Sequence, residues 1–264
     1  MIGYRSLGAA VALLVACSAG PIAAGDAAPQ FDHSGWSRLL AAHVDASGRV
    51  AYRNLHEKDL PALREYLDAL AGAAPADWPR PEQLAFWINA YNAGVVWAVL
   101  QGESAESQAG RDGLFKSWKF RVAGQERTPD EIEHRILRAQ FAEPRIHFAI
   151  VCASASCPPL RPEAYVAAQL DAQLEAQART FLQDPTRNVI DPKVKTLQLS
   201  AVFDWFHADF EKAAGSVLAF VARHVADPAT QKWLLAGPEK IAYLDYDWTL
   251  NAQPGQRPLE RRSP

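Results

Sequence analysis

The residues of this chain that could do chemistry concentrate in one stretch, from Arg145 to Leu160, RIHFAIVCASASCPPL. His147 supplies an imidazole, and Cys152 and Cys157 supply two thiols. A thiolate is a good nucleophile, and a histidine can serve as its base. The same residue types would also suit a buried strand followed by a local disulfide, because a short loop can return one cysteine to the other. The stretch therefore indicates either a thiol-based site or a disulfide.

Local structure decides which of these groups can meet. The apolar, β-branched residues between Arg145 and Cys152 predict a buried strand. Side chains alternate between the faces of a strand, so His147 and Cys152 would point to opposite faces, about 16 Å apart. We therefore expect no direct thiolate–imidazole pair, and we expect the histidine and the cysteines to serve separate sites.

The segment from Thr128 to Phe141 predicts a helix beside this strand. Thr128 suits the N-cap, Pro129 suits the first helical position, and Glu131 can return a hydrogen bond to the cap. Only a short turn separates the helix from the strand, so the two elements should run antiparallel. Because a helix rises about 1.5 Å per residue and a strand about 3.3 Å, the strand would pass the whole helix within a few residues.

This packing would bring groups of the two elements together. Glu133 and His134 would lie level with His147, where the three could form an acid–base or metal cluster with Asp247 as a fourth member. Cys152 would lie near the helix N-terminus, where the helix dipole lowers the pKa of a thiol. Its partner would come from His207, Asp204 or the Asp245/Asp247 pair. The cysteine spacing matches no common zinc motif, and we predict no metal.

Each of these residues also has a purely structural interpretation. His147 could be a core histidine with satisfied hydrogen bonds, and His134 could lie on a helix surface. The two cysteines could form a disulfide or stay as inert buried thiols. Asp247 and Trp248 could be an edge-strand charge and a packing aromatic. The sequence alone leaves both interpretations open.

The longest apolar element runs from Glu82 to Leu100, EQLAFWINAYNAGVVWAVL. It is apolar on more than one face, which predicts a helix in the middle of the fold. Asn89 and Asn92 are three residues apart and share a face of this helix. A buried amide without a partner costs about 1–3 kcal/mol, so the pair must bond to something. The two amides could tie down neighbouring backbone or, with Trp87, line a binding site.

The rest of the chain predicts a helix-rich α+β domain. Hydrophobic periodicity and turn signals predict further helices at 34–44, 60–71, 163–182, 200–210 and 217–225. They predict short strands at 49–53, 118–122, 125–127, 188–190, 194–199 and 241–250, with a polar loop at 101–112. Together these elements predict a single domain over 31–251, with a long buried central helix and a small, mainly antiparallel sheet.

Composition excludes some classes of protein. The chain has 264 residues, 49% of them hydrophobic, which is enough for a full core. Its formal charge is -3, and its lysines and arginines are scattered. Binding to nucleic acid needs clustered positive charge that displaces counterions from phosphates. We therefore predict no nucleic-acid partner, and the sequence indicates no cofactor.

The N-terminal 27 residues predict an export segment and tether. Arg5 precedes an apolar run over 7–16 that is too short to span a bilayer as a helix. Cys17 ends the sequence Leu-Val-Ala-Cys, which is typical of a bacterial lipobox, although cleavage near Ala24 or Ala27 is the alternative. We expect an exported, periplasmic protein, with membrane contact only through a lipid on Cys17. The tail at 252–264 is expected to be disordered.

Several motifs in fixed order resemble one protein family. They are AFWINAYNA at 85–93, IEH at 132–134, ILR at 136–138, IHFA at 146–149 with Cys152, SCPPL at 156–160, YDW at 246–248 and LN at 250–251, with a weaker VAY at 50–52. These motifs resemble the domain of unknown function 547, found in bacterial exported proteins and in plants. Family members usually carry glycine where this chain has Ala153. The resemblance implies no specific activity.

Two functional hypotheses follow from the sequence. The first is a non-catalytic envelope protein that binds a peptide, glycan or protein partner. Its cleft would be lined by Asn89, Asn92, His134 and His147, with Trp87 and Asp247 as further binding residues. The second is a thiol-dependent hydrolase or acyltransferase that resembles papain or transglutaminase and uses Cys152 or Cys157. Such enzymes place the thiol at the start of the central helix, and residues 83–87 contain no cysteine, so we favour the binding protein.

Overall fold

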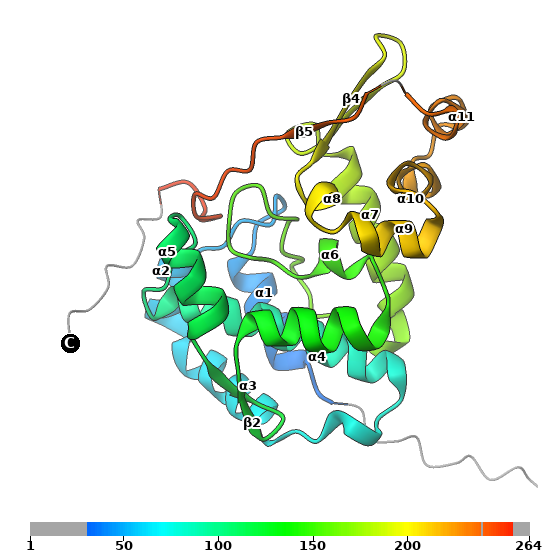
Figure 1. The fold of residues 1–264 in the computed structure, drawn as a ribbon. Coiled ribbons are helices and arrows are strands. Elements are labelled where there is room, and N and C mark those ends of the chain that lie inside the picture. Colours follow the sequence, from blue (N-terminus) through cyan, green and yellow to red (C-terminus); the bar gives the residue numbers. More distant parts are fainter. Residues whose placement is uncertain (1–30, 239, 256–264) are drawn as a thin grey trace, which may run out of the picture.

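The computed structural model describes residues 31–238 and 240–255 (Figure 1). The predicted export segment, the lipidation of Cys17 and residues 256–264 of the predicted tail lie outside these residues. Helices dominate the described part, and two small sheets of two and three strands complete it. The predicted helix-rich α+β class is therefore confirmed. Among the described helices, none has the length and apolar composition that crossing a membrane requires.

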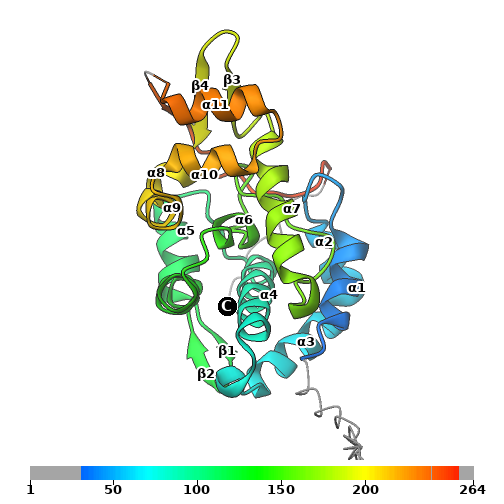
Figure 2. The same ribbon diagram turned by 90° about the vertical axis from the view of Figure 1, so that its right-hand side faces the viewer.

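Helix α4 (Arg80–Leu100) forms the centre of the fold, as predicted. Almost all of its side chains are buried, and it contacts α3 (Leu60–Gly72) and η4 (Glu131–Phe141). Figure 2 shows α4 between η4 on one side and α1 (Ser34–His43) and α3 on the other. Burial on all sides explains why the helix is apolar on more than one face.

The hairpin before η4 and the start of η4 also follow the prediction. Strands β1 (Phe120–Val122) and β2 (Gln125–Arg127) pair antiparallel around a two-residue turn. Thr128 Oγ1 accepts a hydrogen bond from the Glu131 amide, and the Glu131 carboxylate accepts one from the Thr128 amide, both at 3.1 Å. This reciprocal capping box fixes where η4 begins, and hence the position of its first turns.

The C-terminal half adds a second apolar core, rich in phenylalanine, beside the first. Its elements are α7 (Leu170–Gln183), β3 (Val189–Asp191), β4 (Thr196–Ser200), α8 (Val202–Trp205), α9 (His207–Ala214), α10 (Val217–His224), α11 (Pro228–Ala236) and β5 (Ala242–Leu244). Strands β3 and β4 pair antiparallel, and β5 joins β4 in parallel. Figure 1 shows the hairpin, α10 and α11 together at one end of the molecule.

The remaining elements are short. They are α2 (Tyr52–Asn54), η1 (Leu55–Asp59), η2 (Pro75–Asp77), α5 (Gln108–Arg111), η3 (Asp112–Ser117), α6 (Ile146–Ala149) and η5 (Ala167–Gln169). Several of them correct the sequence-based predictions. The strand predicted at 49–53 is α2, the loop predicted at 101–112 contains α5, and the helix predicted from residue 163 begins only at η5. The helix predicted at 200–210 is divided into α8 and α9, the final strand is limited to β5, and α11 was not predicted.

The central strand predicted from Arg145 to Cys152 is also wrong. Residues 146–149 form the helical turn α6, and the chain becomes extended only at Ile150. The reason is a side chain that takes the place of a neighbouring strand. Asn92 donates a hydrogen bond to the Ala149 carbonyl at 2.9 Å and accepts one from the Val151 amide at 2.8 Å. The backbone is thus satisfied without a sheet.

Candidate functional site

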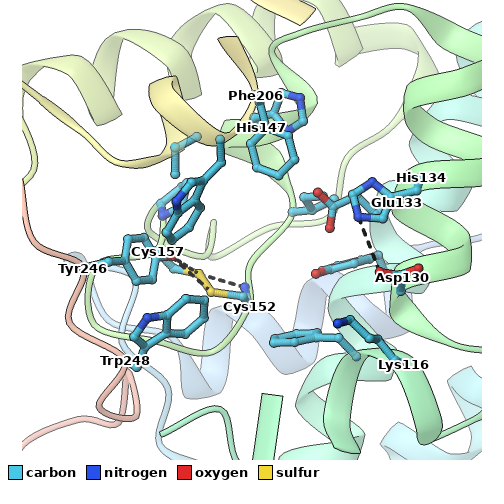
Figure 3. Close-up of a pocket in the computed structure, with 16 residues that line it drawn as sticks. Lys116, Asp130, Glu133, His134, His147, Cys152, Cys157, Phe206, Tyr246 and Trp248 are labelled. Atoms are coloured by element: carbon cyan, nitrogen blue, oxygen red, sulfur yellow. Dashed lines mark hydrogen bonds and ion pairs between the residues drawn. A yellow bond between two sulfur atoms is a disulfide. The ribbon is translucent and has the colours of Figure 1, made fainter. Parts of the chain in front are cut away.

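A pocket of about 200 Å³ lies where both halves of the fold meet. Its lining comes from α4, η3, η4, the loop after α6, α8 and the segment that follows β5. Figure 3 shows Tyr246 and Trp248 on one side of this pocket and Asp130, Glu133 and His134 on the other. We call these two sides the aromatic wall and the titratable wall.

The aromatic wall consists of Trp205, Tyr246 and Trp248, which pack on one another. The Trp205 and Trp248 rings are stacked with centroids 5.7 Å apart, and Tyr246 lies 4.7 Å and 4.5 Å from them. Trp205 remains 46% exposed, which is unusual for so large an apolar side chain. The Arg111 guanidinium lies 4.4 Å from the Trp248 ring and supports it from outside the wall. These rings form an aromatic cluster in the pocket lining, and Trp205 is its exposed member.

The titratable wall centres on Glu133. Burial, with help from the negative charge of Asp130, raises the pKa of Glu133 to about 7, although Arg138 and a hydrogen bond with Tyr91 act in the opposite direction. His134 lies beside it, with Nε2 3.4 Å from an Asp130 carboxylate oxygen. Glu133 can therefore carry or release a proton near neutral pH, which is the property of a general acid or base.

His147 and Asp209 form a pair at the edge of the pocket. His147 Nε2 lies 2.8 Å from Asp209 Oδ2, and the imidazole stacks on Phe206 with centroids 3.9 Å apart. Burial lowers the pKa of His147, which favours the neutral ring although Asp209 acts in the opposite direction, and the hydrogen bonds from His147 and Arg138 lower the pKa of Asp209. A neutral ring that donates from Nε2 leaves Nδ1 as an acceptor. This Nδ1 is buried without a hydrogen-bond partner among the described residues.

The two cysteines form a disulfide that belongs to the pocket lining, which confirms the disulfide alternative. Their Cα atoms are 6.2 Å apart, a usual separation for a disulfide. The Tyr246 hydroxyl lies 3.2 Å from the Cys152 sulfur and 3.4 Å from the Cys157 sulfur. Ala153 adopts the left-handed conformation with φ +63°, which explains why glycine suits this position in the family that the sequence resembles.

The structure brings together all five residues that the sequence marked as catalytic. Glu133, His134, His147, Cys152 and Cys157 line one pocket, so the predicted separation into two sites is wrong. The separation rested on a strand, and the helical turn α6 followed by a bend changes the direction of the side chains. The predicted absence of a direct bond between the imidazole and a sulfur is confirmed, because His147 Nε2 bonds Asp209 and Nδ1 bonds nothing described.

Three residues predicted to bind a ligand lie outside the pocket lining for clear reasons. Asn89 and Asn92 are 1% and 2% exposed. The Asn89 side chain accepts a hydrogen bond from the Tyr165 amide at 3.0 Å and donates one to the Tyr165 carbonyl at 2.7 Å. Asn92 likewise bonds the Ala149 carbonyl and the Val151 amide. Trp87 is buried against Phe86. The interpretation that the amides tie down backbone is therefore confirmed, and the predicted cleft lining that included them is wrong.

Other predicted residues have local structural roles. Asp247 Oδ1 accepts hydrogen bonds from the amide and hydroxyl of Thr249 and does not line the pocket. His207 bonds the carbonyl of Asp204 at 3.1 Å and also lies outside the lining. Over residues 31–238 and 240–255, no three His, Cys, Asp or Glu side chains are arranged to hold a metal. The metal cluster considered for Glu133, His134 and His147 is therefore not formed.

Sequence reasoning did not mark several residues of the site, among them Tyr91, Asp130, Trp205, Phe206, Asp209 and Tyr246. Tyr91 and Asp209 did carry a signal, because a polar group within an apolar helical stripe must find a partner. Trp205 and Tyr246 gave no such signal. Their role depends on contacts between segments far apart in the chain, such as the contact of Tyr246 with Cys152 over 94 residues.

The fold and the pocket define a helix-rich α+β protein with a disulfide in the wall of a small pocket. Residues 75–182 match the family described as Protein of unknown function, DUF547. No curated protein and no solved structure matches the chain. The match confirms the family resemblance over α4, η4 and the disulfide loop, but it ends before the residues of the aromatic wall. The family supplies no activity.

Proposed function

We propose that this protein binds a ligand in the pocket between the aromatic and titratable walls, and that the ligand is a glycan. The observation that carries this proposal is the stacked pair Trp205 and Trp248, of which Trp205 is exposed, opposite Asp130 and Glu133. A sugar ring has an apolar face that packs on an indole and hydroxyl groups on its rim that donate to carboxylates.

The size of the pocket supports a small recognised unit. Its volume of about 200 Å³ lies below the range of about 300–1,000 Å³ that is usual for drug-sized ligands. One ring of a longer chain fits such a volume better than a folded partner does. A peptide that presents an ammonium group to Asp130 and a side chain to the aromatic wall is the alternative ligand.

The thiol-dependent hydrolase is a weaker proposal for the described state. Such an enzyme attacks its substrate with a thiolate. Here the sulfurs of Cys152 and Cys157 are bonded to each other, so neither is a thiolate. A hydrolase would require the disulfide to be reduced before it could act, whereas ligand binding requires no such change. This comparison favours the binding protein.

We also propose that the protein is exported to the periplasm and anchored by a lipid on Cys17. The support is the positively charged start, the apolar run and the lipobox-like sequence, together with a disulfide that suits an oxidising compartment. Radiolabelled palmitate should enter the wild-type protein in a bacterial host and should not enter Cys17→Ser. Label in neither protein would contradict lipidation.

Calorimetric titration with the N-acetylglucosamine trimer and with a tripeptide of matched length tests the binding proposal. We expect saturable binding of the trimer, weakened about tenfold or more by Trp205→Ala, because most of the stacking surface is lost. Trp233→Ala is the matched control, since Trp233 is a partly buried tryptophan of α11 outside the pocket lining. Binding of the tripeptide alone would replace the glycan with a peptide, and binding of neither would contradict the proposal.

A further inference from the structure

The disulfide is part of the pocket surface rather than a staple behind it. Both sulfurs belong to residues that line the pocket. Cys152 is partly exposed, whereas Cys157 is 2% exposed. Figure 3 shows the two cysteines beside Tyr246 and facing the space between the walls. A reagent that enters the pocket therefore meets the Cys152 side of the disulfide first.

The two sulfurs also differ in their hydrogen bonds. Cys157 Sγ accepts a hydrogen bond from the Cys152 amide at 2.8 Å, whereas the contacts of Cys152 Sγ are with hydroxyl groups, Ser154 Oγ at 3.0 Å and Tyr246 at 3.2 Å. The Tyr246 hydroxyl also lies 3.4 Å from Cys157 Sγ, so it is within reach of both sulfurs. Ser154 donates to the Tyr246 oxygen at 3.2 Å, which leaves the Tyr246 proton directed to the sulfurs. Burial raises the pKa of Tyr246 to about 12, so this hydroxyl remains a donor at neutral pH.

These donors favour one direction of bond cleavage. A thiolate that accepts an amide and a hydroxyl hydrogen bond is a better leaving group, because donors stabilise its negative charge. The amide is directed to Cys157 and not to Cys152. Exposure selects Cys152 as the sulfur that is attacked, and the amide hydrogen bond selects Cys157 as the sulfur that leaves. The two observations are independent and agree.

We propose that the disulfide is a thiol–disulfide exchange site for a dithiol that enters the pocket. One thiolate of the dithiol attacks Cys152 Sγ, the bond between Cys152 and Cys157 breaks, and Cys157 leaves as a thiolate. In the mixed disulfide, the first sulfur of the dithiol is bonded to Cys152 Sγ. The second thiolate of the dithiol then attacks that first sulfur, and Cys152 leaves as a thiolate. The dithiol is oxidised to a disulfide, and its two electrons and two protons pass to the two cysteines. This activity goes beyond ligand binding and does not depend on a glycan ligand.

Trapping of the mixed disulfide tests the direction of exchange. The full chain carries Cys17→Ser, so that only the two pocket sulfurs can react. Cys157→Ser and Cys152→Ser are each incubated with oxidised glutathione, and the adducts are counted by mass spectrometry. We expect an adduct on Cys152 to form at least tenfold faster than an adduct on Cys157. Equal rates, or a faster adduct on Cys157, would overturn the assignment.

Reduction of the wild-type disulfide by dithiothreitol needs no cysteine variant and covers the case in which a variant fails to fold. We expect reduction without denaturant, and we expect Tyr246→Phe to slow it about tenfold, because the leaving thiolate loses a hydrogen-bond donor. Tyr243→Phe, on the exposed β5, should leave the rate unchanged. Reduction only in denaturant, or equal rates for both tyrosine variants, would show a structural disulfide and overturn the exchange site.

Discussion

His147 Nε2 lies 2.8 Å from Asp209 Oδ2, although the two residues are 62 positions apart in the chain. Asp209 also accepts a hydrogen bond from Arg138 of η4 at 2.7 Å. One carboxylate of α9 therefore bonds to α6 and η4, and both of these elements contribute residues to the pocket lining. The stability of the pocket should depend on this carboxylate, which the first prediction tests.

Replacement of Asp209 with asparagine should destabilise the protein by about 1–3 kcal/mol, because the carboxylate's two hydrogen bonds with Arg138 and its one with His147 are weakened. Denaturant unfolding measures this loss. Asp204→Asn, on the exposed face of α8, is the matched control and should change little. Because the pKa of Asp209 is lowered in the folded protein, its contribution is present above the unfolded value and is lost as pH falls through the folded value. A deficit of Asp209→Asn that is unchanged from pH 7 to strong acid would contradict this.

Replacement of Asn92 with alanine should cost about 2–5 kcal/mol of unfolding free energy. It leaves the Ala149 carbonyl and the Val151 amide buried without partners, at about 1–3 kcal/mol each. Asn54→Ala, at a partly exposed position, is the matched control. A loss below 1 kcal/mol at Asn92 would show that the backbone finds other partners, and the explanation for the helical turn α6 would fail.

The raised pKa of Glu133 predicts a pH dependence of opposite sign to that of Asp209. Between the unfolded value, 4.5, and about 7, the folded protein holds a proton that the unfolded chain has released. Glu133 therefore makes the protein less stable as pH rises through this window. Glu133→Gln should gain stability relative to wild type from pH 4.5 to pH 8, measured by denaturant unfolding at each pH.

A suitable control for this series is Glu126→Gln, because Glu126 is an exposed carboxylate of β2. Its stability difference from wild type should stay constant across the same pH range. If Glu133→Gln also stays constant, Glu133 titrates normally, and its assignment as a proton carrier in the pocket is wrong.

The parts of the fold that local sequence determines could be predicted. The capping box at Thr128, the hairpin β1–β2 and the apolar length of α4 depend on residues close together in the chain. The strand predicted around His147 failed because its backbone partner is the Asn92 side chain, which no local pattern reveals. Hydrophobic periodicity identifies apolar segments, but it does not identify the groups that satisfy their backbone hydrogen bonds.

The candidate site was also predictable only in part. The sequence identified Glu133, His134, His147 and both cysteines by residue type, but it could not place them in one pocket. Their grouping depends on contacts over many residues, such as the 62 residues between His147 and Asp209. The sequence correctly predicted that the buried amides of Asn89 and Asn92 need hydrogen-bond partners. In the structure these partners are backbone groups.

The central claim is that the aromatic and titratable walls enclose a ligand site. The most direct measurement is an NMR titration of the full-length protein with the N-acetylglucosamine trimer that follows the indole N–H signals. We predict saturable shifts of the Trp205 and Trp248 signals with one common dissociation constant, and no shift of Trp233 on α11. Signals of Trp205 and Trp248 that stay in place at every trimer and tripeptide concentration would contradict the account.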